Sequence, residues 1–269
     1  MNTHLKRWLT ALIAIPALVL LIGPGPRWLF HLVLCAVSLV GLMEFYGITA
    51  TRIPNFVRWS NSFLTLLLFV AIYMRHILLA PVIIVLWAFL PMTSFMLTHP
   101  SPQRGSTGDL GKAVFGPIYV ALPLALLALI DFRPGGEVWI FFLLTVIFAS
   151  DTGAFYFGKL FGRHKLYEAV SPGKTWEGAI GGLVSSLIAA SLFLCLVDLH
   201  PLDIKMVVLV LLLSAAGQIG DLAESTLKRG HGVKDSGHIL PGHGGILDRI
   251  DGLIFAIPVL YLYISLWII

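Results

Sequence analysis

The fold of this chain is restricted most strongly by a series of long apolar segments. A helix needs about 20 apolar residues to cross the hydrocarbon core of a bilayer, or somewhat fewer where polar ends reach the interface. About nine segments meet this requirement. They lie near residues 8–22, 28–48, 61–75, 77–97, 113–131, 137–158, 178–198, 205–222 and 250–268. The sequence therefore predicts an all-α, polytopic membrane protein with about nine transmembrane helices.

Composition supports this class and argues against others. The chain is 58% hydrophobic and 12% charged, whereas soluble domains are about half apolar and about a quarter charged. The net charge of +4 reflects a shortage of acidic residues rather than a basic arm, so we expect no nucleic-acid partner. The two cysteines, Cys35 and Cys195, lie in apolar segments and indicate no disulfide framework.

Basic residues indicate how the segments are oriented. If the N-terminus is cytoplasmic, 14 of the 18 lysine and arginine residues fall in cytoplasmic connections. The positive-inside rule therefore favours a cytoplasmic N-terminus and an external C-terminus. Two long connections, near 159–177 and 224–249, are then cytoplasmic. Connections longer than about 12–15 residues tend to be functional, so we expect the Gly-rich site loops there.

The segments predict one integral membrane domain over residues 1–269, with N-terminal helices in 1–112 and a site-bearing part in 113–269. The first segment ends at a Gly-Pro-Gly-Pro sequence without a small-residue cleavage site, so we expect it to remain an uncleaved span. Only Met-Arg-His-Ile separates the third and fourth segments. This leaves open either a tight hairpin or one long, broken segment.

The most informative stretch is GQIGDLAESTLKRGHGVKDSGHILPGHGGILDRIDG, residues 217–252. Four of its polar residues have helical spacing and should share one face: Asp221, Glu224, Ser225 and Lys228. Asp248 and Asp251 stand three apart where the last apolar segment begins, and a helix N-terminus favours anions and phosphate. The dense glycines between these groups suit a backbone that bends sharply or approaches a ligand closely.

These residues point to phosphoryl or nucleotidyl transfer with a divalent metal. Mg²⁺ prefers oxygen ligands, usually one or two carboxylates with water and substrate phosphate, and Asp221, Asp248 and Asp251 can provide them. Basic side chains that can neutralise phosphate oxygens are Lys228, Arg229, Lys234 and Arg249. The simpler alternative is that the aspartates cap a helix and the basic residues only mark the cytoplasmic face. His243 and its neighbouring histidines lack the fuller ligand set of a zinc site, so we expect polar or phosphate contacts.

The other long connection belongs to the stretch between residues 150 and 182. Asp151 lies within a predicted span, where an acidic residue is a functional candidate by default. A cationic cluster follows it: Lys159, Arg163, Lys165 and Lys174. Lys174 fits a substrate contact and an ordinary cytoplasmic lysine equally well. Ser171, with a proline directly after it, predicts the N-cap of the helix that enters the next span.

The stretch STLKRGHGVKDSGHILPGHGGILDRID, residues 225–251, resembles the signature of the phosphatidate cytidylyltransferase (CDP-diacylglycerol synthase) family. The matching positions are Ser225, Lys228, Arg229, Lys234, Asp235, His243, Gly244, Gly245, Asp248, Arg249 and Asp251. The segments SDTGAFYFGKLFGRHKL and SPGKTWEG are also similar to the family. The resemblance covers most of residues 150–252, whereas the N-terminal half matches only in having several spans.

The resemblance implies that CTP and phosphatidate are converted to CDP-diacylglycerol and diphosphate, with Mg²⁺, at the inner membrane of a bacterial cell. It associates Asp221 and Asp248 with the metal, and we add Asp251. The expected catalytic residues are Asp221, Lys228, Arg229, Asp248 and Asp251. The expected substrate-binding residues are Asp151, Lys159, Arg163, Ser171, Lys174, Ser225, Lys234, His243, Gly244, Gly245 and Arg249. From the resemblance we also expect that a second cation such as K⁺ can bind and that the protein can form a homodimer.

Three other functions deserve comparison. A related cytidylyltransferase for another lipid phosphate, such as an archaeal ether lipid, would share these motifs. An ion-coupled transporter would also use intramembrane acids and broken helices, but it would not need the basic, Gly-rich and acidic groups clustered on one side. A CDP-alcohol phosphotransferase would carry an Asp-Gly-x-x-Ala-Arg segment, which this sequence lacks.

Overall fold

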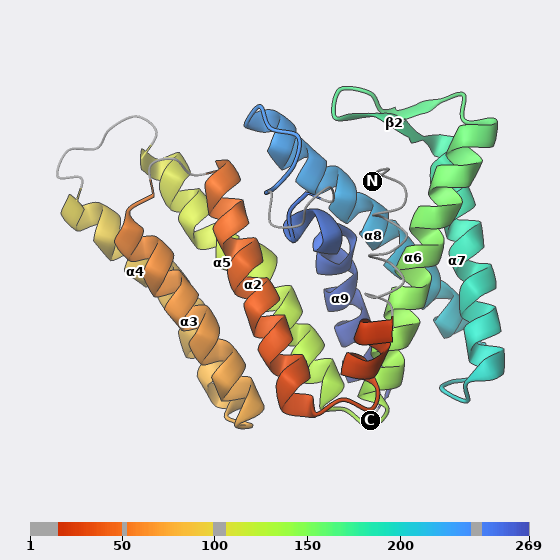
Figure 1. Cartoon of the computed structure of the whole chain (residues 1–269), viewed down its shortest axis with the longest axis horizontal. Coiled ribbons are helices and arrows are strands. Elements are labelled where there is room, and N and C mark those ends of the chain that lie inside the picture. The colour runs from red at the N-terminus through yellow and green to blue at the C-terminus, as the bar shows by residue number, and fades with distance from the viewer. Residues whose placement is uncertain (1–15, 50–52, 99–105, 238–243, 269) are drawn as a thin grey trace, which may run out of the picture. The chain divides into compact units, whose positions relative to one another are not determined.

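The computed structural model describes residues 16–49, 53–98, 106–237 and 244–268. The long helices are α2 (Arg27–Thr49), α3 (Asn55–Tyr73), α4 (Ala80–Thr98), α5 (Ser106–Asp131), α6 (Gly136–Phe161), α7 (Trp176–Leu196), α8 (Ile204–Gly230) and α9 (Leu247–Trp267). A short 3₁₀ helix, η1 (Ile77–Leu79), precedes α4, and two strands, β1 (Lys165–Tyr167) and β2 (Ser171–Thr175), lie between α6 and α7 (Figure 1).

The helices confirm an all-α integral membrane protein. Eight of the described helices are long and apolar enough to cross a bilayer, and they correspond to eight of the nine predicted spans. Of the remaining predicted span, near 8–22, residues 16–22 are helical and the rest lies outside the described residues. The chain divides into two compact units. One contains residues 1–129 and 235–247, and the other contains residues 130–234 and 248–269.

In the first unit, α3 and α4 form a tight hairpin, which resolves the alternative that the sequence left open. Arg75 adopts a left-handed backbone conformation with φ of 63°. The N–H of His76 donates to the carbonyl of Ala71 at 2.8 Å. This hydrogen bond closes the C-terminus of α3 as in a Schellman turn, so the chain reverses within a few residues instead of continuing as one broken helix.

A buried polar contact joins three helices of the same unit. The Tyr46 hydroxyl on α2 donates to the carbonyl of Ala113 on α5 at 3.0 Å. The Asn61 amide on α3 donates to the Tyr46 oxygen at 2.7 Å and to the same carbonyl at 2.9 Å. Polar groups away from water need such partners, and these bonds specify how the three helices pack.

In the second unit, glycines allow the helices to approach closely. A Cβ atom on Gly178 of α7 would lie 2.7 Å from the carbonyl oxygen of Ala154 on α6. A Cβ atom on Gly220 of α8 would overlap the carbonyl oxygen of Asp251 on α9. One turn earlier, Gly217 packs against Gly252. The glycines of the GQIGD and RIDG sequences are therefore needed where α8 meets α9.

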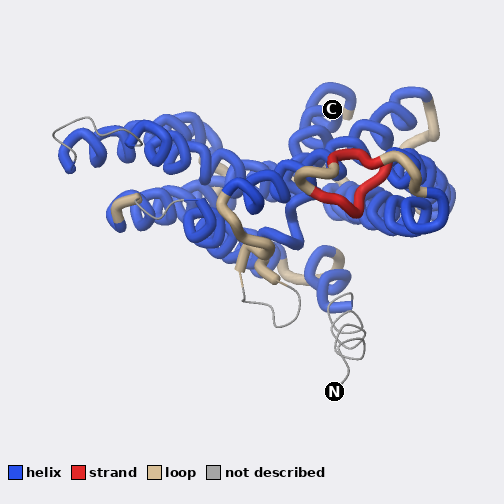
Figure 2. The backbone as a smooth tube through the Cα atoms, turned by 90° about the horizontal axis from the view of Figure 1, so that it is seen from above, coloured by secondary structure: helices blue, strands red, loops and turns tan. Residues whose placement is uncertain are grey.

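The connection between α6 and α7 is an antiparallel hairpin, with Lys165 opposite Thr175 and Tyr167 opposite Ser171 (Figure 2). The prediction that Ser171 caps α7 is wrong. Thr175 is the N-cap, because its side-chain oxygen accepts from the N–H of Gly178 at 3.1 Å. Ser171 is instead held in strand β2, four residues before the N-cap.

The second long connection is shorter than the sequence predicted. Helix α8 continues to Gly230, about two turns beyond the apolar segment that ends near residue 222. The polar residues after 222 have helical spacing and good helix propensity, so the helix extends beyond its apolar residues. The acidic and basic side chains between residues 222 and 230 therefore lie on a regular helix and not in a loop.

Candidate active site

The candidate site lies where α8 meets the first turns of α9. The close backbone approach at Gly220 brings Asp251 against α8. Asp248 lies in the first turn of α9, three residues earlier. Asp221 follows Gly220 directly on α8. The crossing therefore places Asp248 and Asp251 on a helix that packs against the one carrying Asp221.

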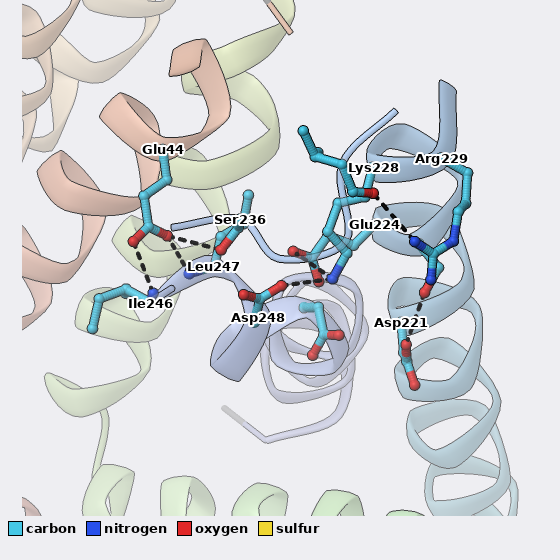
Figure 3. A network of polar contacts seen from close by, with 12 residues as sticks. Glu44, Asp221, Glu224, Lys228, Arg229, Ser236, Ile246, Leu247 and Asp248 are labelled. Carbon is cyan, nitrogen blue, oxygen red and sulfur yellow. Dashed lines mark hydrogen bonds and ion pairs between the residues drawn. The ribbon is translucent and has the colours of Figure 1, made fainter. Parts of the chain in front are cut away.

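Lys228 is the central cation of this group (Figure 3). Its Nζ lies 2.6 Å from Oδ1 of Asp248 and 3.4 Å from Oε1 of Glu224. The Glu224 side chain is buried and faces Asp251. Two carboxylates thus lie beside one nearly buried ammonium group, which gives Lys228 opposite charge away from bulk water.

A second lysine reaches the same helix from the β hairpin. Lys174 Nζ lies 2.6 Å from Oδ2 of Asp221. The Ser225 hydroxyl, one helical turn after Asp221, donates to its other oxygen at 3.4 Å. Asp151 on α6 lies close enough to interact with the charges of Asp221 and Lys174. The ion pair places Lys174 beside a predicted metal ligand, and its contact with substrate stays a prediction.

Magnesium binding at these groups stays a prediction. In the described ranges, no three His, Cys, Asp or Glu side chains are grouped closely enough to hold a metal by themselves. Mg²⁺ does not require this, because it usually takes one or two carboxylates and fills its remaining positions with water and substrate phosphate. Asp221 and Asp248 are the two aspartates of this group that form ion pairs with lysines.

Several predicted residues lie apart from the carboxylates. Arg229 donates to main-chain carbonyls, from Nε to Val170 at 3.5 Å and from an η nitrogen to Val233 at 3.2 Å. It therefore ties the end of α8 to the β hairpin. Lys159, Arg163 and Lys234 are exposed, and in the described structure their side chains form no ion pair. Their substrate roles stay predictions.

Two glycines of the Gly-rich segment, residues 237–245, have positions that a larger residue would not adopt easily. Gly244 has a φ of +77°, which side-chain-bearing residues rarely adopt, and Gly245 is buried. Arg249 is exposed in the first turn of α9. His243, predicted to contact substrate, lies outside the described residues.

Sequence reasoning missed Glu44. This acidic residue lies within the apolar helix α2 and is buried. Its carboxylate contacts Ser236, Ile246 and Leu247, which flank the Gly-rich segment (Figure 3). The signal was available, because an acid inside a predicted span is a functional candidate by default. We applied that argument to Asp151 and not to Glu44.

Comparisons with known proteins agree with the motifs. The sequence profile of the cytidylyltransferase family matches residues 5–267. Over 258 residues the chain is 37% identical to a phosphatidate cytidylyltransferase of Staphylococcus haemolyticus, covering 94% of this chain and 96% of the relative. A phosphatidate cytidylyltransferase of Staphylococcus saprophyticus is 41% identical over 175 residues, or 64% of this chain and 66% of the relative. That of Bacillus subtilis is 47% identical over 132 residues, or 49% of each chain. The last two alignments span less than two thirds of those relatives.

Proposed function

This chain belongs to the cytidylyltransferase family, and we propose that it transfers the cytidylyl group of CTP to phosphatidate, forming CDP-diacylglycerol and diphosphate. The observation that carries the proposal is the set of lysine–carboxylate pairs at the crossing of α8 and α9. Such a site can bind phosphate through its cations and a divalent metal through its carboxylates. An ion-coupled transporter needs no such pairing at one end of its helices, and family membership does not favour it.

The reaction needs positioning more than proton transfer. A phosphate monoester has a second pKa of about 6, so the lipid phosphate is largely ionised at neutral pH and can attack without a general base. One of its oxygens forms a bond to the α-phosphorus of CTP. The bond from that phosphorus to the bridging oxygen of the β-phosphate breaks, and diphosphate leaves. The site must hold two polyanions together in line, which requires fixed positive charge.

Lys228 and Lys174 are placed to supply that charge. Each lysine lies 2.6 Å from an aspartate oxygen. A phosphate oxygen is an equivalent acceptor for an ammonium group. When substrate phosphates enter, the lysines can donate to them, and the carboxylate oxygens of Asp221 and Asp248 become available to a metal.

Mg²⁺ is the cation that we propose for this site, held by Asp221 and Asp248 with Asp251 beside them. When bound, it supplies charge neutralisation for the triphosphate and for the leaving diphosphate. Ser225 orients Asp221 through its hydroxyl, and Arg229 keeps the β hairpin against α8. A second cation such as K⁺ stays a prediction from the family resemblance.

The direct test is incubation of the purified protein with labelled CTP, Mg²⁺ and phosphatidate. We expect a labelled CDP-lipid and one equivalent of diphosphate. Diacylglycerol, which lacks the attacking phosphate, should give no product. An ether-linked lipid phosphate tests the related substrate class. Absence of product with phosphatidate, or faster turnover of the ether lipid, would overturn the proposed substrate.

We propose that the site faces the cytoplasm of a bacterial cell, where CTP is available, and that the protein resides in the inner membrane. Reporter fusions after Lys165 and after Lys234 should both read as cytoplasmic, because the basic residues favour this side. A periplasmic signal from either fusion would refute the orientation. A homodimer is also expected, and light scattering with correction for bound detergent measures it.

A further inference from the structure

Glu44 is a buried carboxylate that the proposed chemistry does not use. It lies in α2, within an apolar stretch long enough to cross the membrane. An acidic side chain in such a place is costly and requires partners or a function. Its partners are 192 to 203 residues away in sequence. The contact is therefore a product of the tertiary fold and not of local structure.

Both oxygens of Glu44 accept hydrogen bonds from one short segment. Oε1 accepts from the N–H of Ile246 at 3.0 Å. Oε2 accepts from the N–H of Leu247 at 2.9 Å and from the hydroxyl of Ser236 at 3.1 Å. Leu247 is the first residue of α9. Glu44 thus satisfies free N–H groups at the start of a helix, where negative charge is also favourable.

The segment leaves no room around this carboxylate. A Cβ atom on Gly237 would lie 2.6 Å from Oε1 of Glu44. A Cβ atom on Gly245 would overlap both Oε2 of Glu44 and Oγ of Ser236. The two glycines are therefore required by close contact with Glu44, which holds both sides of the Gly-rich segment at once.

We infer that Glu44 is a positioning residue that anchors the Gly-rich segment and thereby sets the backbone at Asp248, an inference that rests on the proposed function. Asp248 follows Leu247 directly in the chain, and its carboxylate forms the 2.6 Å contact with Lys228 (Figure 3). A backbone held by Glu44 at residues 246 and 247 leaves little freedom at the next Cα atom. Small displacements of a reacting group can cost about 100-fold in rate.

The charge of Glu44 matters as well as its size. An ionised carboxylate offers acceptors on both oxygens, whereas an amide offers one acceptor and one donor. Glu44→Gln has nearly the same shape, but its NH₂ group must face the N–H of either Ile246 or Leu247. One hydrogen bond becomes a donor–donor contact, so this variant separates the charged anchor from simple packing.

The test compares Glu44→Gln with Asn61→Ala in the CTP and phosphatidate assay. Asn61 is a matched control, because it is buried in the same unit and its two buried hydrogen bonds go to Tyr46 and to the carbonyl of Ala113. We expect Glu44→Gln to lower kcat about 10- to 100-fold and to raise the Mg²⁺ concentration for half-maximal rate. Asn61→Ala should lower thermal stability while kcat per folded protein and the Mg²⁺ dependence stay near those of the wild type.

Hydrogen–deuterium exchange gives a readout that does not depend on turnover. The amides of Ile246 and Leu247 should be protected in the wild type and exchange faster in Glu44→Gln, but not in Asn61→Ala. If Glu44→Gln fails to fold, Ser236→Ala replaces it, because this variant removes only one of the three bonds and should show a smaller change of the same kind.

The outcomes are distinct. Wild-type kcat, Mg²⁺ dependence and amide protection in Glu44→Gln would overturn the inference. A loss of kcat that Asn61→Ala reproduces per folded molecule would reduce Glu44 to a stability role and also overturn it. If the wild type makes no CDP-lipid, the proposed function fails, and the exchange measurement alone decides whether Glu44 anchors the segment.

Discussion

Replacing Lys228 by glutamine should destabilise the protein far more than the same replacement of Lys174. Both lysines lie 2.6 Å from an aspartate, so distance does not distinguish the two ion pairs. Burial does. The side chains of Lys228 and Asp248 are 12% and 10% exposed, whereas those of Lys174 and Asp221 are 26% and 42% exposed.

The exposures set the expected magnitudes. Removing one partner of a buried pair costs about 3–5 kcal/mol, because the remaining charge is left uncompensated. Lys228→Gln leaves the nearly buried Asp248 carboxylate without its 2.6 Å cation and also removes the contact at 3.4 Å to the buried Glu224. Exposed pairs contribute about 0–1 kcal/mol. At about 2–4 °C per kcal/mol for a protein of this size, Lys228→Gln should lower Tm by roughly 6–20 °C. Lys174→Gln should lower it by less than about 4 °C.

The assay is thermal unfolding in one detergent, followed by tryptophan fluorescence, for which the chain has seven tryptophans. The double variant Lys228→Gln/Asp248→Asn should recover part of the loss, because it removes a charge of each sign from the buried site. Equal Tm shifts for the two lysine variants would refute the argument from burial. So would a double variant less stable than Lys228→Gln alone.

Three further predictions concern the same site. Asp221→Asn and Asp248→Asn should each abolish CDP-lipid formation per folded molecule, and Asp248→Asn should also lower Tm because it breaks the buried pair with Lys228; activity per folded molecule within a few-fold of the wild type would remove that residue from the metal site. Lys228→Ala should lower kcat/KM by about 10- to a few-hundred-fold, and full rescue by added Mg²⁺ in a titration would show that the lysine acts on the metal instead of on phosphate. Gly220→Ala should disrupt the site, because its methyl group meets a backbone carbonyl of α9, whereas Gly230→Ala has open space and should keep wild-type activity and Tm; equal losses in both variants would contradict the close-packing argument.

Much of the architecture was predictable because it depends on properties of single segments. Each span is recognised from the length of its own apolar segment, because the bilayer requires that length of every spanning helix independently of the others. The functional stretch was equally visible, because Asp221, Lys228, Asp248 and Asp251 are conspicuous in a chain with so few charges. Boundaries were less predictable. Helix α8 ends at Gly230. A hydropathy pattern predicts only the apolar part of a helix, so it does not predict polar turns that continue the same helix.

The N-cap of α7 illustrates a choice that local sequence does not make. Ser171 and Thr175 are both suitable cap residues, and a proline after Ser171 favoured the earlier position. Pairing of Tyr167 with Ser171 keeps that residue in a strand. The helix therefore begins only after Thr175, whose side chain bonds the N–H of Gly178.

The sequence by itself determined that this is a membrane enzyme of the cytidylyltransferase family and which stretch carries its charged groups. Only the tertiary structure decided which charges meet. Lys174 pairs with Asp221 across 47 positions of sequence, and Glu44 reaches a segment about 200 residues away. The physical reason is that transfer into a bilayer is governed by each segment's own composition. Contacts between charges depend instead on where helices cross. Glycines permit those crossings, but they have no side chain from which the contacting helix could be predicted.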